Sequence, residues 1–113
     1  MILVVEDDED VRDMLALTLQ GRHFPVVLAK NGADALNVLA NRRPCLVMLD
    51  LVMPGIDGHE VLARMKAHGY DSPVVVISAL DREQPEGTVA TLRKPFENPV
   101  LLELATRYCT CDR

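Results

Sequence analysis

Five residues with side chains suited to phosphate or metal binding occur where apolar segments of the chain end. Glu6 and Asp7 follow the first apolar segment, Asp50 ends a second, and Ser78 and Lys94 stand at the ends of two later ones. Three carboxylates that converge on one point would repel one another unless a divalent cation lay among them. Mg²⁺ binds one or two carboxylates together with a phosphate oxygen, and an ammonium group and a hydroxyl suit the remaining phosphoryl oxygens. If the fold brings these residues together, they therefore indicate phosphoryl chemistry.

Asp50 is the residue on which this chemistry depends. It ends an apolar segment that is bounded by Pro44 and Pro54 and is short enough to be a strand buried on both faces of a parallel sheet. Packing gives such a strand no use for an acid, and an ionised carboxylate is costly to desolvate. Asp50 should therefore meet charged partners that other parts of the chain supply.

Strands and helices alternate along the chain. The expected strands are residues 2–5, 25–29, 46–50, 73–78 and 89–93. Apolar residues at helical spacings of three and four follow the first, second, third and fifth strands. This alternation predicts one α/β domain, residues 1–113, with an open parallel sheet and helices on both faces. Ligands of such sheets bind at the carboxyl ends of the strands, where all five candidate residues fall.

Capping residues mark the expected helix ends. Asp8 or Asp10 can cap the first helix, Asp57 the third and Asn98 the last, and Gly69 can end the third. The spacing of three and four that predicts the first helix is that of Val11, Met14, Leu15 and Thr18.

The connection after the fourth strand is short. Residues 79–86 lead to Gly87 and include Pro85, whereas a parallel crossover ordinarily takes a dozen or more residues, most of them helical. The fourth helix of a regularly alternating fold is therefore predicted to be shortened or missing.

Composition narrows the class of protein. The chain has 113 residues and a net charge of −5, which argues against a nucleic-acid surface. The apolar runs fall short of a membrane span and the first residues lack the basic flank of a signal peptide, so we expect a cytoplasmic protein without membrane contact. Its three cysteines, Cys45, Cys109 and Cys111, are expected to be free thiols, with Cys45 in the core.

In the order and spacing of these motifs, the chain resembles the receiver domain of two-component response regulators over essentially its whole length. The matching segments are Ile2 to Asp8, Asp50 with Met53-Pro54 and Asp57-Gly58, Ser78-Ala79, and Lys94-Pro95-Phe96. The resemblance implies a flavodoxin-like, doubly wound sheet of five strands in the order 2-1-3-4-5.

The resemblance also implies a phosphorelay function. Asp50 would be the nucleophile that takes a phosphoryl group from a phosphohistidine of a histidine kinase or histidine phosphotransfer protein. Ser78 and Lys94 would bind the phosphoryl oxygens of the product. Such a domain promotes its own phosphotransfer and a slow loss of phosphate, and is not a conventional enzyme.

The cofactor implied by the resemblance is Mg²⁺. Asp7, Asp50 and the backbone carbonyl of Val52 would bind the ion directly, and Glu6 would act through water. Each of these residues alone has an ordinary structural explanation, such as a helix cap for Asp7. Their joint placement carries the assignment.

Other functions fit the sequence less well or stay open as alternatives. An aspartyl phosphohydrolase would need a general acid near Asp50, where the following residues are apolar, and a flavin or nucleotide binder would need a glycine-rich first loop. The main alternative is a receiver-like interaction module that works without phosphorylation. Thr91, which stands where the family usually has an aromatic residue, leaves that alternative open. The kinase, the output, the oligomeric state, and whether the chain stands alone or is part of a longer protein also stay open.

Overall fold

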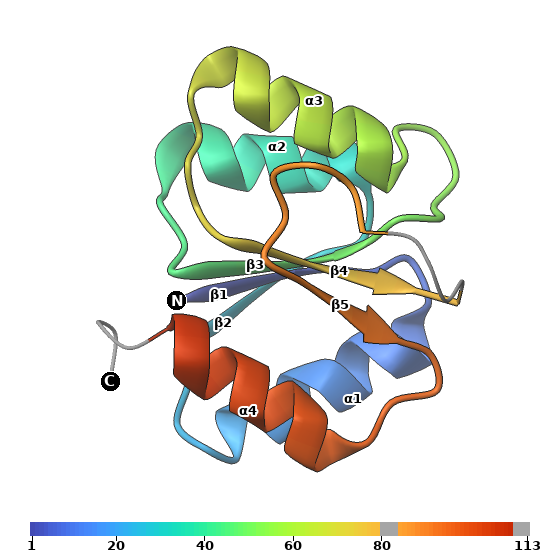
Figure 1. Ribbon diagram of the computed structural model, residues 1–113, viewed down its shortest axis with the longest axis vertical. Coiled ribbons are helices and arrows are strands. Elements are labelled where there is room, and N and C mark those ends of the chain that lie inside the picture. The colour runs from blue at the N-terminus through green and yellow to red at the C-terminus, as the bar shows by residue number, and fades with distance from the viewer. Residues whose placement is uncertain (80–83, 110–113) are drawn as a thin grey trace.

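A computed structural model describes residues 1–79 and 84–109. The elements in chain order are β1 (Ile2–Val5), α1 (Glu9–Gln20), β2 (Val26–Ala29), α2 (Gly32–Asn41), β3 (Leu46–Asp50), α3 (Gly58–His68), β4 (Val74–Ser78), β5 (Ala90–Arg93) and α4 (Asn98–Tyr108). All strand pairs are parallel, and the sheet has the order β2-β1-β3-β4-β5. α1 and α4 cover one face of the sheet and α2 and α3 the other (Figure 1). The predicted fold class and strand order are confirmed.

The three central strands carry apolar side chains on both faces, which explains their uninterrupted apolar runs. Every residue of β1, β3 and β4 is buried. Alternate residues enter two separate cores, as the period of two in a strand requires. Ile2 and Met48 belong to the core that includes Leu101 of α4, and Leu3 and Leu49 to the core that includes Val61 of α3. Because both faces are covered, a polar side chain can reach solvent only past a strand end.

Side chains cap the first three helices at their amino termini. Oδ1 of Asp8 accepts a hydrogen bond from the Val11 N–H at 3.2 Å, and Oδ1 of Asp57 accepts one from the Glu60 N–H at 2.9 Å. Gly69 ends α3 in the left-handed conformation with φ of 72°, which glycine adopts at little cost. The predicted caps at Asp8 and Asp57 and the predicted stop at Gly69 are confirmed. No described helix is both long enough and apolar enough to cross a membrane.

One expectation about a helix end was wrong in detail. Asn98 is the first residue of α4 and not its cap; Glu97 holds the cap position, without a side-chain hydrogen bond. On α1 the buried positions include Leu15 and Leu19, whereas Met14 is 37% exposed. Leu15 and Leu19 pack in the core that also contains Leu101 of α4.

The connection between β4 and β5 contains no helix among its described residues, which are 79 and 84–89. Instead, a turn in which the Thr88 N–H donates to the Pro85 carbonyl at 3.2 Å leads to β5, with Gly87 at φ of 87°. The prediction of a shortened or missing fourth helix is confirmed. The label α4 therefore belongs to the helix after β5.

The expectation that the cysteines are free thiols was wrong for two of them. Cys45, directly before β3, forms a disulfide with Cys109, directly after α4. The two residues are separated by 64 positions in the sequence, so only the packing of α4 against the sheet brings them together. Cys111 lies outside the described residues.

The loop after β3 returns close to the strand at Gly58. The Gly58 N–H donates to the Leu51 carbonyl at 3.1 Å. A Cβ added at Gly58 would lie 2.6 Å from the Leu51 Cα and 2.7 Å from the Asp50 carbonyl oxygen. These contacts are with backbone, which cannot move aside without displacing Asp50.

Gly58→Ala should therefore lower the free energy of unfolding by about 1–3 kcal/mol, the usual cost of overpacking. Urea unfolding of both proteins measures the change. Gly21→Ala is the matched control, because Gly21 has a right-handed helical φ of −62° and its nearest new contact would be at 3.3 Å. Equal stability of Gly58→Ala and the control would show that the β3 end tolerates a side chain here.

Candidate functional site

Asp50 lies at the carboxyl end of the central strand. Its side chain is largely buried, with a relative exposure of 4% for the residue. The Val52 N–H donates to its Oδ1 at 3.1 Å, and the Leu51 N–H continues the ladder to the Ile77 carbonyl. These two hydrogen bonds fix the position of the carboxylate at the carboxyl end of the strand.

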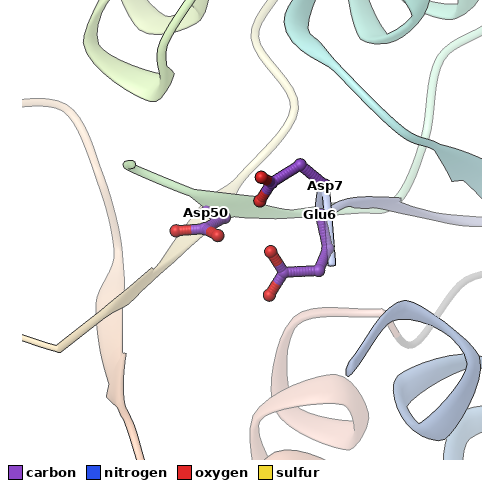
Figure 2. A group of neighbouring side chains, drawn as sticks. All are labelled: Glu6, Asp7 and Asp50. Carbon is purple, nitrogen blue, oxygen red and sulfur yellow. The ribbon is translucent and has the colours of Figure 1, made fainter. Parts of the chain in front are cut away.

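β1 brings two further carboxylates to the same edge. Glu6 continues the sheet past β1, with its N–H donating to the Ala29 carbonyl at 3.1 Å, and its side chain is fully buried, whereas Asp7 is exposed. Glu6, Asp7 and Asp50 each offer one oxygen, and these oxygens all lie within 4.8 Å of one another. Figure 2 shows the three carboxylates gathered at the ends of β1 and β3. The predicted convergence of these acids is borne out by the geometry.

Lys94 supplies a positive charge to this cluster from the end of β5. Its Nζ lies 3.0 Å from Oε1 of Glu6 and 3.4 Å from Oδ2 of Asp50. Its backbone N–H donates to the Ser78 carbonyl at 2.8 Å, and the Lys94–Pro95 peptide bond is cis. The lysine side chain is 31% exposed, so its ammonium group sits between the buried acids and solvent.

Ser78 ends β4, the strand between those that carry Asp50 and Lys94. The register pairs Asp50 with Ile77 and Ser78 with Arg93, so the hydroxyl-bearing residue lies one position beyond the level of Asp50. Ser78 is 2% exposed. All the predicted side-chain ligands therefore lie at one edge of the sheet. Val52, whose backbone carbonyl is the remaining predicted ligand, stands two residues after Asp50 and is 73% exposed.

The electrostatics of Glu6 indicate that the cluster lacks positive charge. Burial is the largest cause that raises the pKa of Glu6, to about 8, and the hydrogen bond with Asp50 adds to it, while Lys94 acts in the opposite direction. Burial lowers the pKa of Lys94, but Glu6 and Asp50 raise it by more. Oε2 of Glu6 is buried and has no hydrogen-bond partner among the described residues. A hard cation with oxygen ligands fits this site, since it would offset the charge that Lys94 does not, and a water ligand of the ion could donate to the unpaired oxygen.

Sequence reasoning missed one residue next to the site. The guanidinium of Arg12 donates from Nη1 to the Glu6 carbonyl oxygen at 3.1 Å. Arg12 lies in the first turn of α1, so the helix that follows Glu6 and Asp7 places a positively charged side chain next to them. The signal available in the sequence was the basic residue that follows an acidic run at helical spacing.

Thr91 occupies the position in β5 three residues before Lys94. It is half-buried, and its Oγ1 lies 3.5 Å from Oε1 of Gln84 in the short connection. A small polar side chain on β5 therefore contacts the short connection between β4 and β5.

Comparison with known proteins relates the chain to one family. The family model described as response regulator receiver domain matches residues 2–106. The chain is 44% identical over 80 residues to response regulator MprA of Mycobacterium sp. (strain KMS), an alignment covering 71% of this chain and 35% of that protein. The chain therefore spans about a third of the length of this relative.

Solved structures with the same fold are also similar. The receiver domain of NtrX from Brucella abortus superposes with a TM-score of 0.84 at 30% identity, covering 98% of this chain and 99% of that one. Response regulator protein TrrA from Thermotoga maritima, solved in complex with Mg(2+)-BeF, gives a TM-score of 0.85 at 28% identity, covering 95% and 96%.

The raised pKa of Glu6 makes the stability of the metal-free protein depend on pH. Between pH 4.5 and about 8 the folded chain holds a proton on Glu6 that the unfolded chain has released, so the free energy of unfolding falls as pH rises through this window. Glu6→Gln has no carboxyl group to titrate and should remove this pH dependence. From pH 5 to pH 8 the free energy of unfolding should therefore fall more in the wild type than in the variant, by on the order of 3 kcal/mol.

Urea unfolding in EDTA at the two pH values measures the difference. Glu9→Gln, which changes an exposed acid of the same acidic run, should keep the wild-type dependence. Identical pH dependence of the wild-type and Glu6→Gln proteins would contradict the burial argument.

Proposed function

The chain belongs to the family of response regulator receiver domains, and from this premise we propose that it takes a phosphoryl group from a phosphohistidine onto Asp50. The donor is a histidine kinase or a histidine phosphotransfer protein. The observation that carries the proposal is the position of Asp50, a buried carboxylate with an ammonium group at 3.4 Å and two more carboxylates beside it. A buried carboxylate beside an ammonium group supports the proposal that Asp50 is the nucleophile that attacks phosphorus.

The proposed step is an in-line displacement. A carboxylate oxygen of Asp50 forms a bond to phosphorus while the bond from phosphorus to the imidazole nitrogen breaks, and the imidazole keeps the electron pair. Transfer of this kind depends mainly on positioning and on charge neutralisation. The Val52 N–H holds Oδ1 of Asp50, and Lys94 lies at Oδ2, ready to bind an oxygen of the arriving group. The Ser78 hydroxyl is proposed to bind another.

Mg²⁺ is the proposed cofactor, held by Asp7, Asp50 and the Val52 carbonyl, with Glu6 acting through water. When bound, the ion supplies positive charge that neutralises the phosphoryl oxygens. Two facts support this assignment: the unpaired buried oxygen of Glu6 and the similarity to TrrA, which was solved with Mg(2+)-BeF. The chain's own residues then orient the acceptor and keep it in place.

The setting of this reaction is part of the proposal. The domain acts in the cytoplasm as a signalling module that promotes its own phosphotransfer and its own slow dephosphorylation. Its net charge of −5 fits a partner protein better than direct contact with nucleic acid. Phosphorylation would switch its interactions with partners.

One pair of observations favours the alternative of an interaction module that works without phosphorylation. The described part of the β4–β5 connection has no helix, and Thr91 replaces the aromatic residue that the family usually has. Both features would weaken any coupling between phosphorylation of Asp50 and the surface formed by β5 and the segment before it. The two functions differ in whether Asp50 accepts phosphate at all.

Incubation with acetyl phosphate and Mg²⁺ should add a phosphoryl group to the wild-type protein, and Asp50→Asn should abolish the addition while preserving the fold. Asn is nearly isosteric and removes one charge from a crowded acidic site. Intact-protein mass spectrometry measures the addition, and circular dichroism checks the fold. Asp13→Asn, on the exposed side of α1, is the matched control and should be phosphorylated normally. Phosphorylation of Asp50→Asn would disprove the nucleophile, and none in the wild type would favour the alternative function.

The phosphorylated protein should be long-lived, because the residue two positions after Asp50 is Val52, which cannot orient water by a hydrogen bond. Val52 is 73% exposed, so a polar replacement fits without repacking. Val52→Asn should speed the loss of phosphate severalfold, measured by mass spectrometry after removal of acetyl phosphate. The same argument applies to Leu80, which lies outside the described residues. Decay of the Val52→Asn phosphoprotein at the wild-type rate would rule out this explanation.

A further inference from the structure

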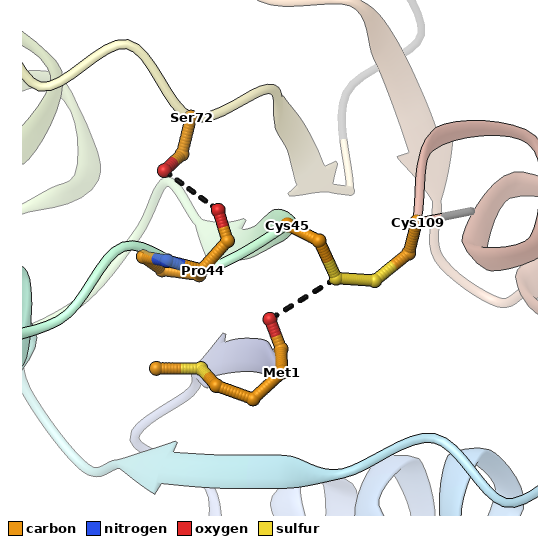
Figure 3. Close-up of a disulfide and its surroundings, with 5 residues drawn as sticks. All are labelled: Met1, Pro44, Cys45, Ser72 and Cys109. Atoms are coloured by element: carbon orange, nitrogen blue, oxygen red, sulfur yellow. Dashed lines mark hydrogen bonds between the residues drawn. A yellow bond between two sulfur atoms is a disulfide. The ribbon is translucent and has the colours of Figure 1, made fainter. Parts of the chain in front are cut away.

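Cys45 and Cys109 meet at the edge of the sheet opposite to the acidic site. Cys45 precedes β3 whereas Asp50 ends it, so the two lie at opposite ends of one strand. The Cα atoms of the two cysteines are 5.0 Å apart, within the range of about 4.4–6.8 Å that a disulfide spans. Figure 3 shows the bond joining the start of β3 to the end of α4.

The backbone holds both cysteines in the paired position. The Cys45 N–H donates to the Met1 carbonyl at 2.9 Å, and the Ser72 hydroxyl donates to the carbonyl of Pro44, the preceding residue, at 2.8 Å. The Cys109 N–H donates to the Ala105 carbonyl at 2.9 Å. These hydrogen bonds do not involve the sulfur atoms, so they remain available to hold both backbones when the disulfide is open.

The surroundings also accept the two thiols. The Cys45 sulfur lies 3.2 Å from the Met1 carbonyl oxygen, so a Cys45 thiol has an acceptor in place (Figure 3). Cys109 is fully buried in the apolar core shared with Leu101 and Ala105, where a neutral thiol packs as a small apolar group. Cys45 is half-buried and is therefore the more accessible of the two sulfurs.

We propose that Cys45 and Cys109 form a reversible redox cross-link that fastens the end of α4 to β3, independently of phosphorylation. The oxidant is a small-molecule disulfide of the glutathione class. The Cys45 thiolate attacks one sulfur of glutathione disulfide, which gives a mixed disulfide and releases one glutathione thiolate that takes up the proton. The Cys109 thiolate then attacks the Cys45 sulfur, and the second glutathione leaves as a thiol. Two protein thiols are oxidised to one disulfide while one glutathione disulfide is reduced to two thiols.

The cross-link changes how firmly α4 is held. In the reduced state its last turn depends on the burial of Ala105 and of the following Cys109 and on helix hydrogen bonds, and helix ends held in this way open locally. The disulfide removes this opening and closes a long loop, because the two cysteines are 64 positions apart. The oxidised domain thus has a more stable α4 with an unchanged acidic site.

The first experiment measures the pairing. The full chain is equilibrated with reduced and oxidised glutathione at a series of ratios, quenched with acid, alkylated with N-ethylmaleimide, and analysed by mass spectrometry. Trypsin leaves Cys109 and Cys111 on one peptide, because the chain has no Lys or Arg between Arg107 and Arg113. The Cys111→Ser variant therefore identifies the partner of Cys45. We expect a Cys45–Cys109 disulfide that forms as oxidised glutathione increases and is lost as reduced glutathione increases.

The second experiment measures the effect on α4. Oxidation should raise the melting temperature by about 10 °C and slow amide hydrogen exchange in the last turn of α4 by about tenfold or more. Cys111→Ser should show both changes. Cys45→Ala and Cys109→Ala should show neither, and comparing each variant with and without reductant separates this effect from any loss of stability caused by the substitution.

Three results would overturn the proposal. One is a Cys45 disulfide with Cys111 and not with Cys109. Another is a Cys45–Cys109 disulfide that millimolar reduced glutathione does not open in the folded protein, which would make it a permanent bond. The third is the same reductant-dependent shift in Cys45→Ala as in the wild type. Phosphorylation by acetyl phosphate is measured separately, so its failure would leave the redox result unaffected.

Discussion

The burial of carboxylates at the ends of fully apolar strands is the constraint on which the site depends. β1 and β3 are covered on both faces, so Glu6 and Asp50 leave the core at points where water is already excluded. Desolvation then favours their neutral forms, and the pKa of Glu6 rises even though Lys94 lies 3.0 Å from it. One ammonium group therefore does not offset the negative charge at this edge. A second cation bound at this acidic cluster would therefore stabilise it.

The order of the strands explains why the side chains at the site differ in length. β3 is central, with β1 on one side and β4 on the other, so the acids of β1 and the hydroxyl of Ser78 come from adjacent strands and need only short side chains. β5 is separated from β3 by β4, a distance of about 10 Å between strand axes. The four-carbon side chain of a lysine covers most of that distance and brings Nζ to 3.4 Å from Asp50 and 3.0 Å from Glu6, which follows the still more distant β1. A shorter basic residue at position 94 would not reach the acceptor.

Much of this arrangement follows from the sequence, because parallel strands impose it. Apolar runs identified the strands. The carboxyl ends of parallel strands lie at the same edge of the sheet, so the acids, the hydroxyl and the lysine at those ends identified the site. The features that were missed depend on packing that no local pattern records. The pairing of Cys45 with Cys109 requires the end of α4 to lie against the start of β3, and the contact from Arg12 to the Glu6 carbonyl requires the orientation of the first turn of α1.

The two ends of α4 are held by different chemistry, and this follows from where the helix begins and ends. Its first residue lies four positions after Lys94, whose ammonium group contacts Asp50, and its last is followed by Cys109 at the opposite edge of the sheet. A change of charge at Asp50 acts on Lys94 and so on the segment that leads into α4. A change of redox state acts on the other end of the same helix. Both proposed changes would therefore act on α4, one at the segment that leads into it and the other at its last turn.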